Sequence, residues 1–171
     1  GAVLTRRDLA EKIASTAANL GGSMNAMTCY LLERSLKTLG VRVDKHNCNA
    51  QIIAEHLQKD ARIRKVFYPG LESHPGHALA KKQMHGFGGM LAFELDGPAP
   101  ERFLKNLSVI TPALSLGGVE TIICSPATTS HQKISAAERA ELGITDATLR
   151  LSVGIEDPDD IIADIDRALS G

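Results

Sequence analysis

The sequence predicts an α+β protein, in which a small antiparallel or mixed β-sheet is covered by helices on one face and is preceded by a long helix. Two observations lead to this fold class. No proline occurs before Pro69, and the first sixty residues carry apolar side chains at helical spacing. After that point short strand-like runs alternate with helical patterns, which is typical of α+β folds. The length of 171 residues suits one domain, or one domain with an appendage.

The first helix is expected to begin after Thr5. Thr5 is a suitable N-cap residue, and Asp8 stands at the position from which it can complete a capping box. The pair Gly21–Gly22 is expected to end this helix, because glycine readily adopts the backbone conformation that closes a helix.

Residues 25–60 carry the most regular pattern of the sequence. Asn25 or Ser23 can cap a helix that extends to about Lys59, a length of roughly 50 Å at 1.5 Å per residue. Such a helix exceeds the diameter of a small domain, so we expect it to pack against more than its own domain. Gly40 is the point at which it would bend or divide. The apolar stripe consists of Leu32, Leu36, Leu39, Val43, His46, Ala50, Ile53 and Leu57.

Residues 61–171 are expected to form the small α/β domain. Pro112 restricts its segment to an edge or a break in the sheet. Ser135 and Gly143 mark the start and end of one helix, and Asp157–Pro158 marks the start of the last. The predicted strands are 66–68, 90–95, 109–110, 114–116, 121–124 and 149–153, and the predicted helices are 76–85, 100–107, 135–142 and one from 157 onward.

Composition excludes two classes of protein. The mean hydropathy of -0.05, with no long uncharged apolar stretch, argues against a membrane-spanning helix. A net charge of -1, with 4% aromatic residues, argues against nucleic-acid binding. The cysteines Cys29, Cys48 and Cys124 are widely spaced, and we expect reduced, mostly buried thiols and a cytoplasmic location.

Few residues suggest chemistry by their pattern alone. His74, His77 and His85 lack a carboxylate at a supporting spacing, so we expect no metal site. The acidic run 156–160 fits the first turn of a helix better than a cation site. Arg150 alternates with apolar neighbours in a strand and is able to clamp a carboxylate, but the pattern alone favours an ordinary exposed arginine. These patterns alone indicate a soluble α+β domain.

Five strings in register resemble the Cys/Met-metabolism family of pyridoxal-phosphate enzymes. That family includes cystathionine γ-synthase, cystathionine γ-lyase, cystathionine β-lyase, methionine γ-lyase and the O-acyl-homoserine sulfhydrylases. The resemblance covers essentially the whole chain. The strings are LLERSLKTL with VR at 31–42, YPGL followed by HP at 68–75, GGMLAFEL at 88–95, SLGGVET at 115–121 and LRLSVGIED at 149–157.

This resemblance is to the C-terminal domain of the fold type I pyridoxal-phosphate enzymes. The family's cofactor, pyridoxal 5'-phosphate, is an electron sink for a carbanion at the substrate's α-carbon. Its Schiff-base lysine lies in a Ser-x-Thr-Lys context within a large N-terminal domain. Lys37 does not have that context. The resemblance therefore implies a C-terminal fragment without the lysine, inactive alone, whose partners are the missing domain and other subunits of a homotetramer. Residues 1–24 would be a remnant and connector, 25–60 a bridging helix and 61–171 the small domain.

The resemblance also implies the site residues. Arg150 matches the family's carboxylate-binding arginine, Ser115 a residue close to the lysine and the carboxylate, and Leu116 a backbone N–H donor to that carboxylate. Leu114 departs from the acidic residue common in cystathionine γ-lyases and γ-synthases. This departure favours a C–S lyase such as methionine γ-lyase or a β-lyase over the alternatives, a γ-synthase or a sulfhydrylase. An isolated non-catalytic assembly module is the second alternative.

Overall fold

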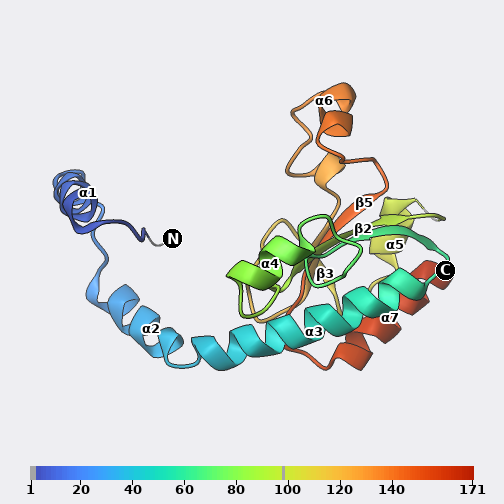
Figure 1. Ribbon diagram of the computed structural model, residues 1–171, viewed down its shortest axis with the longest axis horizontal. Coiled ribbons are helices and arrows are strands. Elements are labelled where there is room, and N and C mark those ends of the chain that lie inside the picture. The colour runs from blue at the N-terminus through green and yellow to red at the C-terminus, as the bar shows by residue number, and fades with distance from the viewer. Residues whose placement is uncertain (1–2, 98) are drawn as a thin grey trace. The chain divides into compact units, whose positions relative to one another are not determined.

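The computed structural model describes residues 3–97 and 99–171. The chain divides into two compact units, Gly1–Gly40 and Val41–Gly171. The first contains helices α1 (Arg7–Asn19) and α2 (Ala26–Leu36) (Figure 1), and no residue of either helix is buried. The second unit contains the sheet and the core.

Helix α1 begins differently from the prediction. Arg6 takes the N-cap position and makes no capping bond with its side chain, so the capping box expected at Thr5 and Asp8 is not formed. Instead the Arg6 guanidinium lies 3.3 Å from the Asp8 carboxylate. The expected cap of the next helix is present, since Asn25 Oδ1 accepts the Thr28 N–H at 2.9 Å.

The single helix expected over residues 25–60 is two helices. Helix α2 ends at Leu36, and α3 runs from Leu39 to Lys59. The break falls at Lys37–Thr38, where the Thr38 N–H bonds to the Ser35 carbonyl in a tighter turn, and not at Gly40. Only the end of the apolar stripe is buried, at Ala50, Ile53 and Leu57, and its earlier leucines are exposed. No helix in the described residues is long and apolar enough to cross a membrane.

The described residues form a five-stranded mixed sheet in the order β1-β2-β5-β4-β3. β3 pairs parallel with β4, and the other neighbours are antiparallel. Pro112 lies on the edge strand, as predicted. The strand expected at 114–116 is wrong, because the ladder ends after Pro112 and the chain continues as a loop. The bounds are β1 Ile63–Phe67, β2 Met90–Leu95, β3 Thr111–Pro112, β4 Ile122–Cys124 and β5 Thr148–Ser152.

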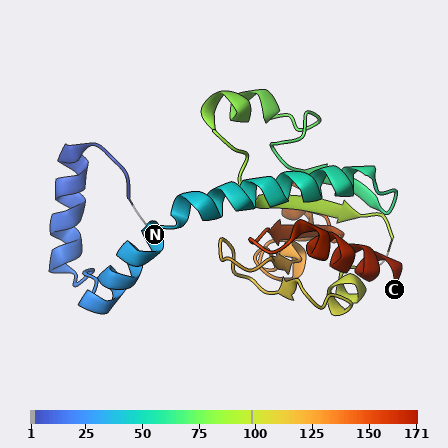
Figure 2. The same ribbon diagram turned by 90° about the horizontal axis from the view of Figure 1, so that it is seen from below.

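Four further helices belong to this unit: α4 (His77–Gln83), α5 (Pro100–Lys105), α6 (Ala136–Glu141) and α7 (Pro158–Ser170). The predicted caps of two of them are confirmed. Ser135 forms a capping box with Glu138, and Asp157 accepts the Asp159 N–H. Helices α3 and α7 lie on one side of β2 and β5, and α6 lies on the other (Figures 1 and 2).

One continuous core joins the sheet to α3, α5 and α7. Alternate residues of the central strands β2 and β5 point into it, as the pleat requires. On β5 these are Leu149 and Leu151, while Arg150 and Ser152 face the opposite side of the sheet. The apolar face of α7, formed by Ile161, Ile165, Ala168 and Leu169, is buried.

A buried carboxylate connects α7 to the segment before β3. Asp164 is 1% exposed and accepts the backbone N–H groups of Ser108, Val109 and Ile110 at 2.8–3.2 Å. Arg167 donates to it from the next turn of α7. Burial alone raises the pKa of this carboxyl, but the three backbone hydrogen bonds outweigh burial and hold its pKa below the usual value.

The cysteines are less buried than predicted. Cys124 is buried in β4, but Cys29 and Cys48 are exposed on helices. Helix α2 buries no residue, and Cys48 is not among the buried residues of α3.

Candidate functional site

The candidate site lies on the face of the sheet that is not covered by α3 and α7. Arg150 occupies the centre of this face, paired across the strands with Ala92 on β2 and with Cys124 on β4. Ser152 follows two residues later on the same face. The predicted alternation of β5 therefore places Arg150 outside the core.

The loop after β3 lies against Arg150. The guanidinium Nη2 donates to the Leu114 carbonyl at 2.8 Å and to the Ser115 carbonyl at 3.1 Å. These bonds bring Arg150 into direct contact with Leu114 and Ser115, which precede it by 36 and 35 residues in the sequence. Leu116 is the next residue of the same loop.

The charge of Arg150 is not neutralised within the described chain. No carboxylate of the described residues forms an ion pair with it. Its Nε is buried without a hydrogen-bond partner. A guanidinium with donors to spare and only neutral carbonyls beside it is suited to bind an anion.

The loop is held at two points, by the end of β5 and by the residues that follow it. The Gly117 N–H donates to Ser152 Oγ at 2.9 Å, and Gly117 has a φ of +75°, which only glycine adopts without strain. Further along, the Ile155 N–H bonds to the Val119 carbonyl at 2.9 Å. These bonds fix the carbonyls that contact Arg150.

The side chains of the loop point outward. Leu114 is 58% exposed and Leu116 is 55% exposed. Within the described residues the Ser115 hydroxyl and the Leu116 N–H make no hydrogen bond, so both remain able to donate to a ligand.

A second set of polar contacts was not predicted from the sequence. Glu156, which resembled an ordinary helix-start acid, accepts the Thr121 N–H at 2.5 Å and the Thr121 hydroxyl at 2.8 Å. Asn49 of α3 donates to the carbonyls of Gly154 and Glu156. Gly154 has no room for a Cβ, since the Val119 carbonyl lies against it. This set fixes the end of β5 beside the site.

The glycine-rich turn before β2 is part of the scaffold. Asn47 Oδ1 accepts the Gly88 N–H at 2.7 Å, and the Tyr68 hydroxyl donates to the Gly88 carbonyl at 3.0 Å. Burial raises the pKa of Tyr68 to about 12, so its phenol remains a protonated donor. The turn orients β2, which pairs with β5 next to Arg150.

His74 and His77 have structural roles. His74 Nδ1 accepts the Gly76 N–H, and His77 contacts the Pro69 carbonyl at 2.7 Å while it stacks on Phe87. Neither belongs to the set of His, Asp and Glu side chains whose ligand atoms come within 4.8 Å of one another.

That set consists of His56, Asp60 and Asp166. Its carboxylates are already compensated, because the Arg62 guanidinium contacts Asp60 at 2.5 Å and Asp166 at 3.4 Å. His56 completes the contacts at 3.0 Å from Asp166. The cluster ties α3 to α7 and carries too little free negative charge to attract a cation.

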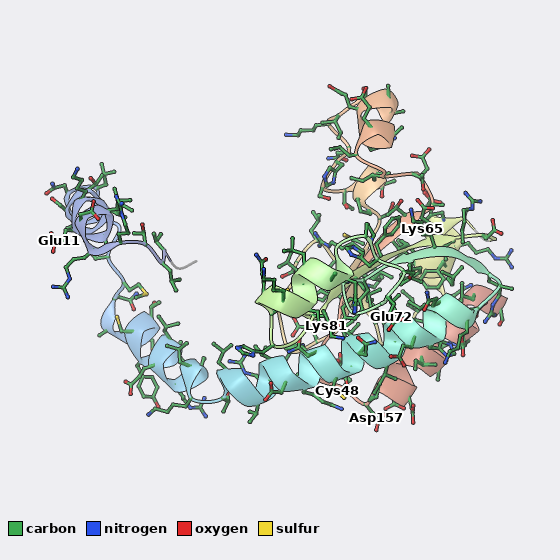
Figure 3. The ribbon with its side chains drawn as sticks, in the orientation of Figure 1. Glu11, Cys48, Lys65, Glu72, Lys81 and Asp157 are labelled. Carbon is green, nitrogen blue, oxygen red and sulfur yellow. The ribbon has the colours of Figure 1, made fainter. Side chains whose placement is uncertain are left out.

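A hollow of about 570 Å³ lies elsewhere, between α3 and the segment that leads into α4. Glu72 and Lys81 on its wall are labelled in Figure 3. Its amides are paired internally, Gln51 with Glu55 and Gln58 with Ser73. None of the candidate site residues lines this hollow.

The chain matches the sequence profile of the family described as Cys/Met metabolism PLP-dependent enzyme over residues 1–170. It is 46% identical over 164 residues to a cystathionine beta-lyase of Lactococcus lactis subsp. cremoris, covering 95% of this chain and 43% of that protein. It is 43% identical to an L-methionine gamma-lyase of Fusobacterium nucleatum subsp. nucleatum, and this match covers 99% of this chain and 44% of that protein.

Solved structures agree with this. A cystathionine gamma-lyase of Micromonospora echinospora superposes with a TM-score of 0.94 at 38% identity, over 99% of this chain and 45% of that one. A cystathionine gamma-synthase of Xanthomonas oryzae pv. oryzae, in complex with aminoacrylate and cysteine, superposes with a TM-score of 0.91 at 42% identity. This match covers 98% of this chain and 44% of that one. The chain thus spans less than half the length of the relatives it matches.

Proposed function

The chain belongs to the family of Cys/Met metabolism PLP-dependent enzymes, and we propose that it is the part of such an enzyme that binds the α-carboxylate of a sulfur amino acid. The enzyme we propose is a C–S lyase. The observation that carries the proposal is Arg150, a guanidinium on the open sheet face whose charge no described carboxylate neutralises.

Arg150 is oriented for this role by the loop. Its Nη2 is held by two carbonyls, which fixes the plane of the guanidinium, while its Nε has no partner among the described residues. A planar, fixed guanidinium binds a carboxylate through two parallel hydrogen bonds. The Ser115 hydroxyl and the Leu116 N–H would complete the contacts. Fixing the carboxylate aligns the Cα–H bond that the reaction breaks.

The same residues do not fit the cofactor's covalent attachment. Arg150, Ser115, Ser152 and the loop backbone supply a guanidinium, hydroxyls and N–H groups, but no primary amine that could form an imine with an aldehyde. We therefore assign the attachment of pyridoxal phosphate to a separate N-terminal domain. Residues 1–24 would connect to that domain, 25–60 would bridge to it, and 61–171 would form the small domain of a cytoplasmic homotetramer.

The isolated 171-residue chain is expected to have no lyase or transferase activity. The reason is that no lysine of the sequence has the Ser-x-Thr-Lys context. The purified chain, mixed with pyridoxal phosphate, should develop no stable Schiff-base absorbance and should release no ammonia or keto acid from methionine or cystathionine. Cofactor-dependent release by this chain, after contaminating enzymes are excluded, would refute the assignment of the lysine to another segment.

The uncharged side chain of Leu114 supports the assignment of the enzyme as a lyase that acts on less polar substrates. Its side chain is 58% exposed beside the Arg150 contact and offers no charge to a distal ammonium group. In the full-length protein, Leu114→Glu should shift the preference toward cystathionine and away from methionine by about 1–3 kcal/mol in the ratio of kcat/KM values. The new carboxylate would pair with the distal ammonium of cystathionine and would meet the apolar tail of methionine unfavourably.

Both substrates are measured on the same variant, with Leu114→Gln as the uncharged control of similar size. Leu114→Gln should lower both activities without the shift. If Leu114→Glu reduces kcat/KM equally for the two substrates, then Leu114 does not contribute to specificity, and the lyase assignment loses this support.

A further inference from the structure

We infer that Ser152 is a positioning residue for the carboxylate site: its hydroxyl holds the 114–117 loop so that the loop carbonyls orient Arg150. The inference rests on the proposed function of Arg150. It concerns a residue that does not itself contact the substrate.

Ser152 lies where such a role requires. It is 2% exposed and follows Arg150 by two residues on β5, so both side chains emerge on the same face of the sheet. Its Oγ accepts the Gly117 N–H at 2.9 Å, across 35 residues of sequence. Among the described residues, this is the hydrogen bond that the Ser152 side chain makes.

The bond acts on the loop at a short distance from Arg150. Gly117 is two residues beyond Ser115, whose carbonyl accepts from Arg150 Nη2 together with that of Leu114. The next anchor along the loop is Val119, which bonds to Ile155. Without the Ser152 bond, the exposed segment between Ala113 and Val119 would be held by Arg150 itself, and the guanidinium plane would no longer be fixed by an independent anchor.

The geometry distinguishes this role from core packing. Ser152 points away from the core formed by Leu149 and Leu151, and it contributes no apolar surface. Thr148 offers a matched comparison, since it is a buried hydroxyl residue on the same strand and the same face. Its hydroxyl accepts the Thr145 N–H at the first residue of β5, whereas Ser152 is the last.

The experiment uses the full-length holoenzyme with four variants: Ser152→Ala, Ser152→Thr, Thr148→Val and Arg150→Ala. Ser152→Ala should raise KM for the amino-acid substrate by about 3- to 10-fold, the effect of one neutral hydrogen bond, and should change kcat by less than about twofold. Ser152→Thr retains the hydroxyl and should restore KM. Thr148→Val should leave KM unchanged.

The double variant Ser152→Ala/Arg150→Ala gives the decisive comparison. If Ser152 acts through Arg150, the second substitution should add no further increase in KM to that of Arg150→Ala. A further increase of threefold or more, or an equal loss of kcat in Ser152→Ala and Thr148→Val, would overturn the inference and indicate a general structural role.

The failure of this inference differs from the failure of the proposed function. If Arg150→Ala leaves KM unchanged, the carboxylate site itself is wrong. If Arg150→Ala raises KM but Ser152→Ala does not, only the positioning role is wrong. Ser152→Cys, whose sulfur is a weak acceptor in nearly the same volume, repeats the test if Ser152→Ala does not fold.

Discussion

Arg150→Ala in the full-length protein is expected to lower kcat/KM for sulfur amino acids by about 30- to 5,000-fold. The physical reason is the loss of a charge-assisted, two-bond contact with the substrate carboxylate, worth roughly 2–5 kcal/mol. The effect should appear mainly as a raised KM. Steady-state kinetics on methionine and cystathionine measure it directly.

Two further variants make this prediction specific. Arg150→Lys should recover only part of the loss, because an ammonium group cannot reproduce the planar fork. Arg64→Ala removes an exposed arginine of β1 whose partner is Asp96, and it should leave the kinetics unchanged. Kinetics within a factor of two of the wild type in both Arg150 variants would mean that the carboxylate is bound elsewhere.

Asp164→Ala is expected to cause the largest loss of stability, roughly 3–5 kcal/mol in the free energy of unfolding. The substitution leaves three backbone N–H groups and the Arg167 guanidinium without their shared acceptor. Urea unfolding followed by circular dichroism measures the loss. Asp160→Ala, an exposed acid in the first turn of the same helix, should cost no more than about 1 kcal/mol. A loss below 1 kcal/mol for Asp164→Ala would contradict the role of this carboxylate.

The contribution of Asp164 should depend on pH. Its pKa is lower in the folded state than in the unfolded chain, because the backbone hydrogen bonds favour the charged form despite burial. The stabilisation is therefore complete above the unfolded pKa, about 4 for an aspartate, and is lost as the pH falls toward the folded pKa. The difference in stability between the wild type and Asp164→Asn should be constant from pH 7 to pH 5 and should narrow below about pH 4.

Local signals predicted much of the fold. The helix start at Ser135, the Asp157–Pro158 helix start and the alternation around Arg150 depend on near neighbours in sequence, and each was predicted correctly. Pro112 marked the sheet edge because a residue without an N–H cannot complete a central ladder.

The differences have tertiary causes. Lys37–Thr38 contains no helix-breaking residue, so the break between α2 and α3 has no local signal. The contact of Glu156 with Thr121 joins residues 35 positions apart, and neither belongs to a recognisable pair in the sequence. For the site, the resemblance indicated Arg150 and the 114–116 loop, but the anchoring of that loop by Ser152 became visible only when the loop and β5 were placed together.

The central claim is that the Arg150 guanidinium binds the substrate's α-carboxylate. The most direct test compares a substrate with its α-carboxamide, which has nearly the same shape but no charge, in the wild-type full-length protein and in Arg150→Ala. The wild type should have a much higher kcat/KM for the acid than for the carboxamide. This ratio should fall nearly to one in Arg150→Ala, because the carboxamide and the substitution remove the same ion pair. An undiminished preference for the acid in Arg150→Ala would contradict the account.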